Sequence, residues 1–218
     1  WRCWEEGDRL DFRGEIYQHT LMTPIFSPGR HPQELPPIFL AGVGPKMTEV
    51  AGEVADGFLI HPFGTARSWR ELSLAALERG LERSGRDRSA LEVSGQLMIC
   101  TGENDEALAA VRQSTKQQIA FYASTPAYRP ILEVHDRGDL QLELNAMSKR
   151  GQWAEMASLV DDDLLEQVAI CAPIGEVAQR VRERCAGVVD RVSLVAHWSN
   201  DPDLWDDVVR DLGDGSQA

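Results

Sequence analysis

A glycine-rich turn is the part of this sequence best suited to chemistry with an anion. Residues 41–46 read Ala-Gly-Val-Gly-Pro-Lys and follow a short apolar run. Gly42 and Gly44 allow a tight turn and the close approach of a ligand to the backbone. Pro45 suits the first position of a helix, where no backbone N–H is needed. Free N–H groups at a helix start that follows a strand form a typical phosphate site.

Two simpler interpretations of this turn stay open. A Gly-x-Gly-Pro sequence between a strand and a helix is often only a tight connection, because short motifs of this kind are weakly specific. Lys46 would add a positive charge beside a bound phosphate, or it would extend into solvent as lysine side chains commonly do.

The turn lies inside an expected strand–helix–strand unit. Residues 36–41 and 57–61 are apolar runs bounded by turn residues, which is typical of buried strands. Between them, apolar side chains recur with helical spacing and predict one apolar face, formed by Met47, Val50, Ala51 and Val54.

Histidines end two of the expected strands. His61 closes the strand at 57–61, and it either contacts a ligand or caps the strand end as a satisfied histidine. His197 follows the last expected strand, where Trp198 and Asn200 favour a packed corner over a site.

Two more strands are expected, at residues 91–100 and 190–196, with helices beginning near Asn104 and Gly175. Residues 10–17 suggest a small hairpin that turns at Gly14, and residues 125–168 suggest a helical insertion without strands. The polar tail, about residues 213–218, is expected to be disordered.

Strands that alternate with helices predict an α/β fold with a parallel sheet. Four strands are half of a (β/α)₈ barrel, which takes about 250 residues. The pattern alone equally allows a small open, doubly wound sheet.

Composition sets further limits. With 218 residues, of which 43 % are hydrophobic, residues 1–218 are expected to form a single domain. The net charge of −13 disfavours nucleic acid and anionic membranes as partners. No apolar run approaches the roughly 20 residues of a membrane span, and we expect a cytoplasmic protein.

The 4 cysteines lack the paired spacing of metal sites, so no metal is expected. Cys100 and Cys171 lie in apolar runs and are expected to be small buried hydrophobes.

Several stretches together resemble the bacterial luciferase-like monooxygenase family. The segment 36–63 is similar to the fifth β-α unit and sixth strand of that family. Trp4 with residues 10–17 resembles the stretch that precedes this unit, and residues 172–177 with 187–194 are similar to the last helix start and eighth strand.

The resemblance implies the C-terminal half of a luciferase-like TIM barrel, strands 5 to 8, with the other half upstream. It implies hydride transfer to or from a small-molecule substrate, with the deazaflavin coenzyme F420, or FMN, at the C-terminal mouth. Overall similarity favours F420. Catalytic residues stay unknown, because the family's ring-binding residues belong to the early strands. The cofactor-binding residues that the resemblance implies are Ala41, Gly42, Val43, Gly44, Lys46 and His61.

Other functions compete with this one. A non-catalytic or degenerate protein would keep the phosphate turn and lack the ring site. An aldolase or isomerase on a phosphate-binding barrel would need a lysine or an acid–base pair at a strand end, and the sequence places no lysine there. Exposed edges of a half-barrel would favour pairing with another chain, as in a homodimer.

Overall fold

The computed structural model describes residues 1–102, 104–196 and 203–214. Contacts divide the chain into two compact units, Trp1–Pro37 and Ile38–Ala218. The first unit holds α1 (Arg2–Glu5), β1 (Phe12–Arg13), β2 (Gln18–His19) and the 3₁₀ turn η1 (Pro24–Phe26). β1 and β2 pair antiparallel, and the N–H of Gly14 donates to the carbonyl of Tyr17 over 2.9 Å. The expected hairpin is therefore confirmed, although its second strand, β2, lies just beyond the expected range 10–17.

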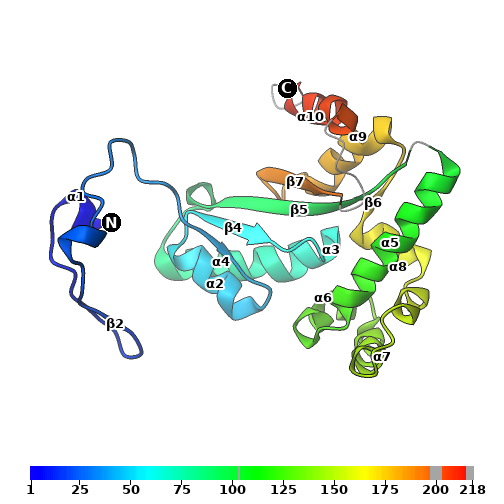
Figure 1. Ribbon diagram of the computed structural model, residues 1–218, viewed down its shortest axis with the longest axis horizontal. Helices are drawn as coiled ribbons and strands as arrows, with labels where there is room; N and C mark the ends of the chain where they lie inside the picture. Colours follow the sequence, from blue (N-terminus) through cyan, green and yellow to red (C-terminus); the bar gives the residue numbers. More distant parts are fainter. Residues whose placement is uncertain (103, 197–202, 215–218) are drawn as a thin grey trace. The chain divides into compact units, whose positions relative to one another are not determined.

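A parallel sheet forms the centre of the second unit (Figure 1). Its strands are β3 (Phe39–Ala41), β4 (Gly57–Ile60), β5 (Glu92–Cys100), β6 (Ile170–Cys171) and β7 (Arg191–Val195). Every pairing is parallel: β3 with β4, β4 with β5, and β5 with both β6 and β7. Within the described residues the sheet is open, because β3 pairs only with β4 and β7 only with β5.

The four expected strands are confirmed, and each is shorter than predicted. The first starts at Phe39 instead of residue 36 because Pro36 and Pro37 have no N–H to give to a ladder. β6 was not predicted, since two residues carry no readable periodicity. In β5, Val93–Gly95 and Leu97–Cys100 are buried, so this strand is the most enclosed element of the sheet.

Helices follow the strands in the expected alternation. The helical segments are α2 (Pro45–Val54), α3 (Ala66–Ser68), the π-helical η2 (Trp69–Leu74), α4 (Ala75–Ser84), η3 (Arg88–Ala90), α5 (Asp105–Ala123), η4 (Pro126–Tyr128), α6 (Arg129–Glu133), α7 (Gly138–Lys149), η5 (Glu155–Leu159), α8 (Asp162–Val168), α9 (Ile174–Cys185) and α10 (Asp203–Asp214). α2 packs on β3 and β4, and α9 packs on β5 and β6. Residues 125–168, all of them described, contain helices and no strand.

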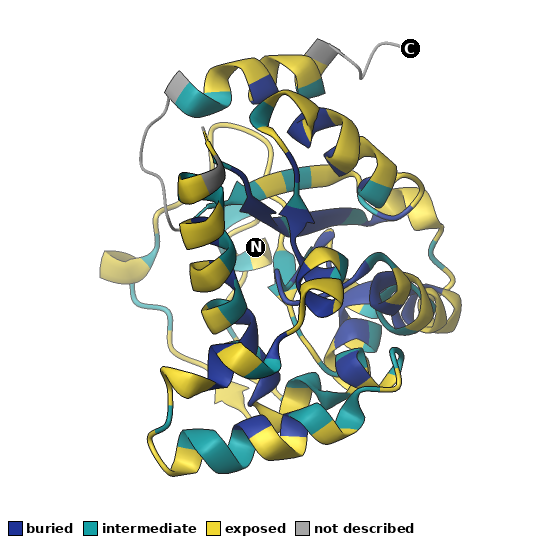
Figure 2. Cartoon of the chain, turned by 90° about the vertical axis from the view of Figure 1, so that its right-hand side faces the viewer, coloured by how far each residue is buried: buried dark blue, intermediate teal, exposed yellow. Residues whose placement is uncertain are grey.

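Two apolar cores hold this unit together. One lies between the sheet and its flanking helices, around Phe58, Trp69 and Val93. The other joins α5, α7, η5 and α8 to Phe63, Met98 and Cys100 at the carboxyl ends of β4 and β5. Figure 2 shows the buried strands in dark blue between helices whose outer faces are exposed. The helices from α5 to α8, here called the helical block, therefore pack directly on the carboxyl end of the sheet, where a barrel site would lie.

Two sequence expectations need correction. The apolar face predicted for α2 is largely exposed: Ala51 is buried, but Met47, Val50 and Val54 are not. The reason is that α2 turns Gly52 toward α4 to allow a close helix contact. Residues 213 and 214, expected to belong to a disordered tail, form the end of α10; residues 215–218 lie outside the described residues.

The contact between α2 and α4 depends on two glycines that face each other. A Cβ at Gly80 would overlap the Glu49 carbonyl oxygen, and a Cβ at Gly52 would overlap the Leu77 carbonyl oxygen. Around this contact, the Arg79 Nε donates to the Glu49 carboxylate over 2.8 Å, and Arg83 pairs with Glu53.

We predict that Gly80→Ala lowers the free energy of unfolding by about 1–3 kcal/mol, because the added methyl must push the two helices apart. Urea unfolding of the variant measures the change. Gly175→Ala is the matched control, since a Cβ at this helical glycine meets no described atom within 4 Å. It should be neutral or stabilise by up to about 1 kcal/mol, as alanine favours helix. Equal effects of the two changes would contradict the close-contact interpretation.

Candidate functional site

The glycine-rich turn lies at the carboxyl end of β3 and leads into α2. Gly44 is the N-cap of α2, with extended backbone angles. The backbone N–H and the hydroxyl of Thr48 both donate to the Gly44 carbonyl oxygen, over 3.2 and 3.1 Å. Thr48 is buried, so these two hydrogen bonds fix the turn against the helix.

The turn presents free backbone donors. The N–H groups of Val43 and Gly44 donate to no atom of the described residues. The N–H groups of Lys46 and Met47 lie in the first helical turn, where no intrahelical acceptor exists. Together with the positive end of the helix dipole, these groups form the donor set that a phosphate requires.

The two glycines differ in what surrounds them. A Cβ at Gly42 would lie 2.9 Å from the Cβ of Met47, so this position needs glycine for packing. A Cβ at Gly44 would meet no described atom within 4 Å, which leaves open space directly over the donors. Ala41, Val43 and Lys46 are exposed, and Lys46 makes no ion pair within the described part of the chain. The turn therefore fits an anionic group, with a free ammonium beside it.

His61 immediately follows β4 and points into an aromatic cluster. Its Nδ1 accepts a hydrogen bond from the Phe63 N–H over 3.1 Å, which leaves the proton of the neutral ring on Nε2. The ring lies edge-on to Tyr122, and its centroid is 4.8 Å from those of Tyr122 and Tyr128. Burial lowers the pKa of His61 below its ordinary value of 6.5. At neutral pH the residue is thus an uncharged donor at the end of the strand.

Two buried threonines lie in the segments that follow β4 and β5. Thr101 follows β5 and is only 1 % exposed, yet its hydroxyl has no hydrogen-bond partner among the described residues. Thr65, in the segment after β4, bonds through its hydroxyl to Nε2 of His135 over 2.8 Å. This bond ties the strand end to the helical block.

Cys100 and Cys171 lie opposite each other in the β5–β6 pair. Cys100 is buried as expected, whereas Cys171 is only partly so. The hydrogen bond to Cys100, reinforced by burial, raises the pKa of the Cys171 thiol, so Cys171 stays protonated. Among the described residues, no group of His, Cys, Asp and Glu is arranged to hold a metal ion.

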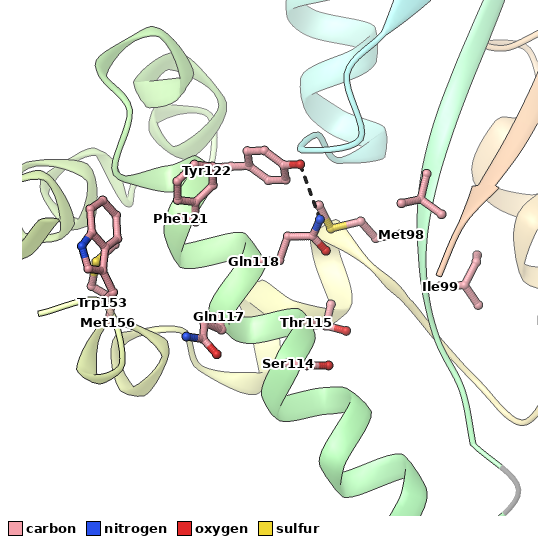
Figure 3. Close-up of a pocket in the computed structure, with 11 residues that line it drawn as sticks. Met98, Ile99, Ser114, Thr115, Gln117, Gln118, Phe121, Tyr122, Trp153 and Met156 are labelled. Carbon is pink, nitrogen blue, oxygen red and sulfur yellow. Dashed lines mark hydrogen bonds between the residues drawn. The ribbon is translucent and has the colours of Figure 1, made fainter. Parts of the chain in front are cut away.

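A pocket of about 520 Å³ opens between the end of β5 and the helical block (Figure 3). Met98 and Ile99 of β5 and Val195 of β7 lie on its sheet side. The helical side consists of Ser114, Thr115, Gln117, Gln118, Phe121 and Tyr122 of α5 together with Trp153 and Met156.

The strand order relates the turn to this pocket. β3 and β5 are separated only by β4, which is two strand spacings of about 5 Å each, but β5 continues for six residues, or about 20 Å, beyond Ser94, which lies level with Ala41. The pocket lining, taken over the described residues, includes none of the six residues that the family resemblance implied. His61 comes nearest, because its ring packs against Tyr122 of the lining.

The sequence did not indicate the residues of α5 that line the pocket. Their signal was weak, since polar and aromatic side chains on one helix face also occur on solvated helices. His197 lies outside the described residues. No described helix is long and apolar enough to cross a membrane.

We predict that the free energy of unfolding falls as the pH is lowered through 6.5. Burial lowers the folded-state pKa of both His61 and His135. As the pH falls, these histidines are therefore protonated more readily in the unfolded chain than in the folded protein, so acid favours the unfolded state. His61→Asn keeps an acceptor for the Phe63 N–H and should reduce this pH dependence of the free energy of unfolding. His135→Asn should remove the part of the pH dependence that His135 contributes. Unfolding measured between pH 5.5 and 7.5 tests this. An unchanged slope in both variants would contradict it.

Comparison with known proteins places the chain among its relatives. A family model described as luciferase-like monooxygenase matches residues 1–191. An uncharacterized protein of Mycobacterium tuberculosis is 52 % identical over 192 residues, which cover 88 % of this chain and 56 % of that protein. The 5,10-methylenetetrahydromethanopterin reductase of Archaeoglobus fulgidus is 27 % identical over 197 residues, covering 86 % of this chain and 54 % of the relative.

The solved structure of the coenzyme F420-dependent tetrahydromethanopterin reductase from Methanopyrus kandleri superposes with a TM-score of 0.72 at 20 % identity. It covers 97 % of this chain and 58 % of that chain, so the present chain spans little more than half the length of these relatives. The likeness confirms the expected fold class, the parallel α/β architecture of luciferase-like barrels. The parallel sheet, the helix start after β3 and the match over residues 1–191 lead to one conclusion: the chain belongs to the luciferase-like monooxygenase family.

Proposed function

We propose that this chain supplies the phosphate-holding half of an oxidoreductase that uses coenzyme F420 to transfer hydride to or from a small organic substrate. The observation that carries the proposal is the set of unpartnered N–H groups around Gly44, with open space above them. Membership of the family supports an oxidoreductase. The F420 dependence of the Methanopyrus kandleri reductase supports the choice of cofactor, and FMN is the alternative that the same turn would accept.

The turn would hold the anionic end of the cofactor. Backbone donors at a helix start carry no net charge, so they bind phosphate without adding a second ion, and Lys46 adds a cation. This local arrangement offsets the repulsion expected from a chain of net charge −13.

The carboxyl ends of β4 and β5 would face the rest of the ligand. His61 offers an uncharged Nε2–H donor, and the hydroxyl of buried Thr101 offers a hydrogen bond that no described residue uses. When bound, the deazaflavin ring supplies the hydride-carrying chemistry, and the protein supplies orientation and exclusion of water. The aromatic side chains around His61 serve that exclusion.

Two further expectations extend the proposal. All four cysteines are free thiols, as suits a reducing compartment, and we place the enzyme in the cytoplasm. The open edges at β3 and β7 and the exposed apolar side chains of α2 leave surface for another folded part, and pairing of two copies is one way to cover it.

Titration of the complete protein with F420 and with FMN, followed by fluorescence, tests the cofactor. Tight binding of F420 and substrate-dependent oxidation of the reduced coenzyme are the expected results. Binding without any turnover across a broad substrate panel would favour a non-catalytic cofactor-binding protein. Failure to bind either cofactor would overturn the proposal.

A charge placed at Gly44 gives the sharpest prediction. We expect Gly44→Asp to weaken F420 binding by about tenfold or more, because a carboxylate would stand beside the phosphate. Gly44→Asn is the matched control, as it adds the same volume without the charge, and both residues tolerate the extended backbone there. Isothermal titration of the complete protein measures both variants. If Asp and Asn weaken binding equally, the turn does not hold an anion.

A further inference from the structure

The pocket beside α5 points to the class of substrate. We propose that it binds a neutral organic molecule that carries a planar ring and a hydrogen-bonding group such as a carbonyl. The inference rests on the proposed oxidoreductase function and specifies the substrate of that enzyme.

Charge is absent from the lining of the pocket as far as the described residues define it. Four of the lining side chains are aliphatic or sulfur-containing, three are aromatic, and the other four carry a hydroxyl or an amide. Burying a phosphate or carboxylate against such a wall would leave a charge without a partner, which costs several kcal/mol. A charged substrate is therefore disfavoured.

The cations of α5 are turned away from the pocket and are already paired. Arg112 contacts Asp162 and Glu166 over 3.0 and 3.3 Å, and Lys116 contacts Asp162 over 2.8 Å. These bonds join α5 to α8. The pocket-lining side chains of α5, such as Gln118, lie on another face of the helix, so the ion-paired cations do not line the pocket.

Aromatic rings form the rim on the helical side. Phe121 and Trp153 are 53 % and 46 % exposed, unusually open for such large apolar side chains, and their ring centroids are 6.0 Å apart. Figure 3 shows them at the side of the pocket away from β5. Rings at this spacing favour offset or edge contacts with a further ring, and exposed apolar patches commonly mark binding surfaces.

Two neutral amides provide the polar contacts. The side-chain amide of Gln117 makes no hydrogen bond to the described residues. The Gln118 amide nitrogen lies 3.4 Å from the Tyr122 hydroxyl, a long bond that leaves its carbonyl oxygen available (Figure 3). Each amide can both donate and accept, which matches a carbonyl, hydroxyl or amide of a ligand.

The size of the pocket agrees with a small organic molecule. Its volume of about 520 Å³ falls inside the range of about 300–1,000 Å³ typical of such sites. Its position at the end of β5 places it beside the strand ends where the family resemblance locates the cofactor.

The test compares two naphthalene probes on the complete protein without cofactor. 2-Acetylnaphthalene is neutral, and 2-naphthoate has the same ring with a carboxylate. We expect the neutral probe to bind about tenfold more tightly or better, by isothermal titration calorimetry. Trp153→Ala should weaken the neutral probe about fivefold or more through loss of the ring contact. Leu142→Ala, an exposed apolar position on α7 outside the pocket lining, should leave it unchanged.

Gln118→Lys tests the neutrality of the site directly, since a cation in the lining should shift the preference toward 2-naphthoate. Equal or tighter binding of 2-naphthoate by the native protein, or no effect of either pocket variant, would overturn the inference. F420 titrations of the same variants separate the two proposals. If the probes behave as expected while F420 does not bind, the cofactor assignment fails and the pocket assignment stands.

Discussion

The common direction of the strands is the constraint on which the site depends. Because β3, β4, β5 and β7 are all parallel, their carboxyl ends meet at one edge of the sheet. A helix start follows β3 and β5 there. The backbone donors, His61 and Thr101 therefore lie on the same edge of the sheet although they come from separate parts of the chain, and Thr101 stands six residues beyond Gly95, the partner of Ile60. Reversing any one of these strands would move its contribution to the opposite edge.

The helical block turns this edge into a partly enclosed site. Phe63, Met98 and Cys100 belong to the same core as α5, α7 and α8, so the block cannot move without exposing apolar surface. The Thr65–His135 bond adds a polar tie at the same edge. Aromatic side chains of α5 are thereby held next to His61 by packing that starts at the strands, and the pocket shares its walls with the core.

Local sequence signals were enough for some features and insufficient for others. The turn at Gly42 and Gly44, the N-cap at Asn104 and the strand through β5 depend on neighbouring residues, and the structure has each of them. The pocket depends on side chains of α5, η5 and two strands that meet only after folding, and no short spacing encodes such a meeting. The exposed Met47 and Val54 show the same limit, because a glycine contact with α4 decided the orientation of α2.

The Thr48 bonds to Gly44 also bear on what kind of ion the start of α2 can bind. The carbonyl oxygen of Gly44 accepts from both the N–H and the hydroxyl of Thr48, so its lone pairs are directed into the protein. The N–H groups of Val43 and Gly44 donate to no atom of the described residues. At Gly44 the acceptor is occupied while the N–H is free, so this residue offers a donor to an oxyanion and little to a metal cation. The buried Thr48 thus removes one acceptor from a turn whose free N–H groups favour negative charge.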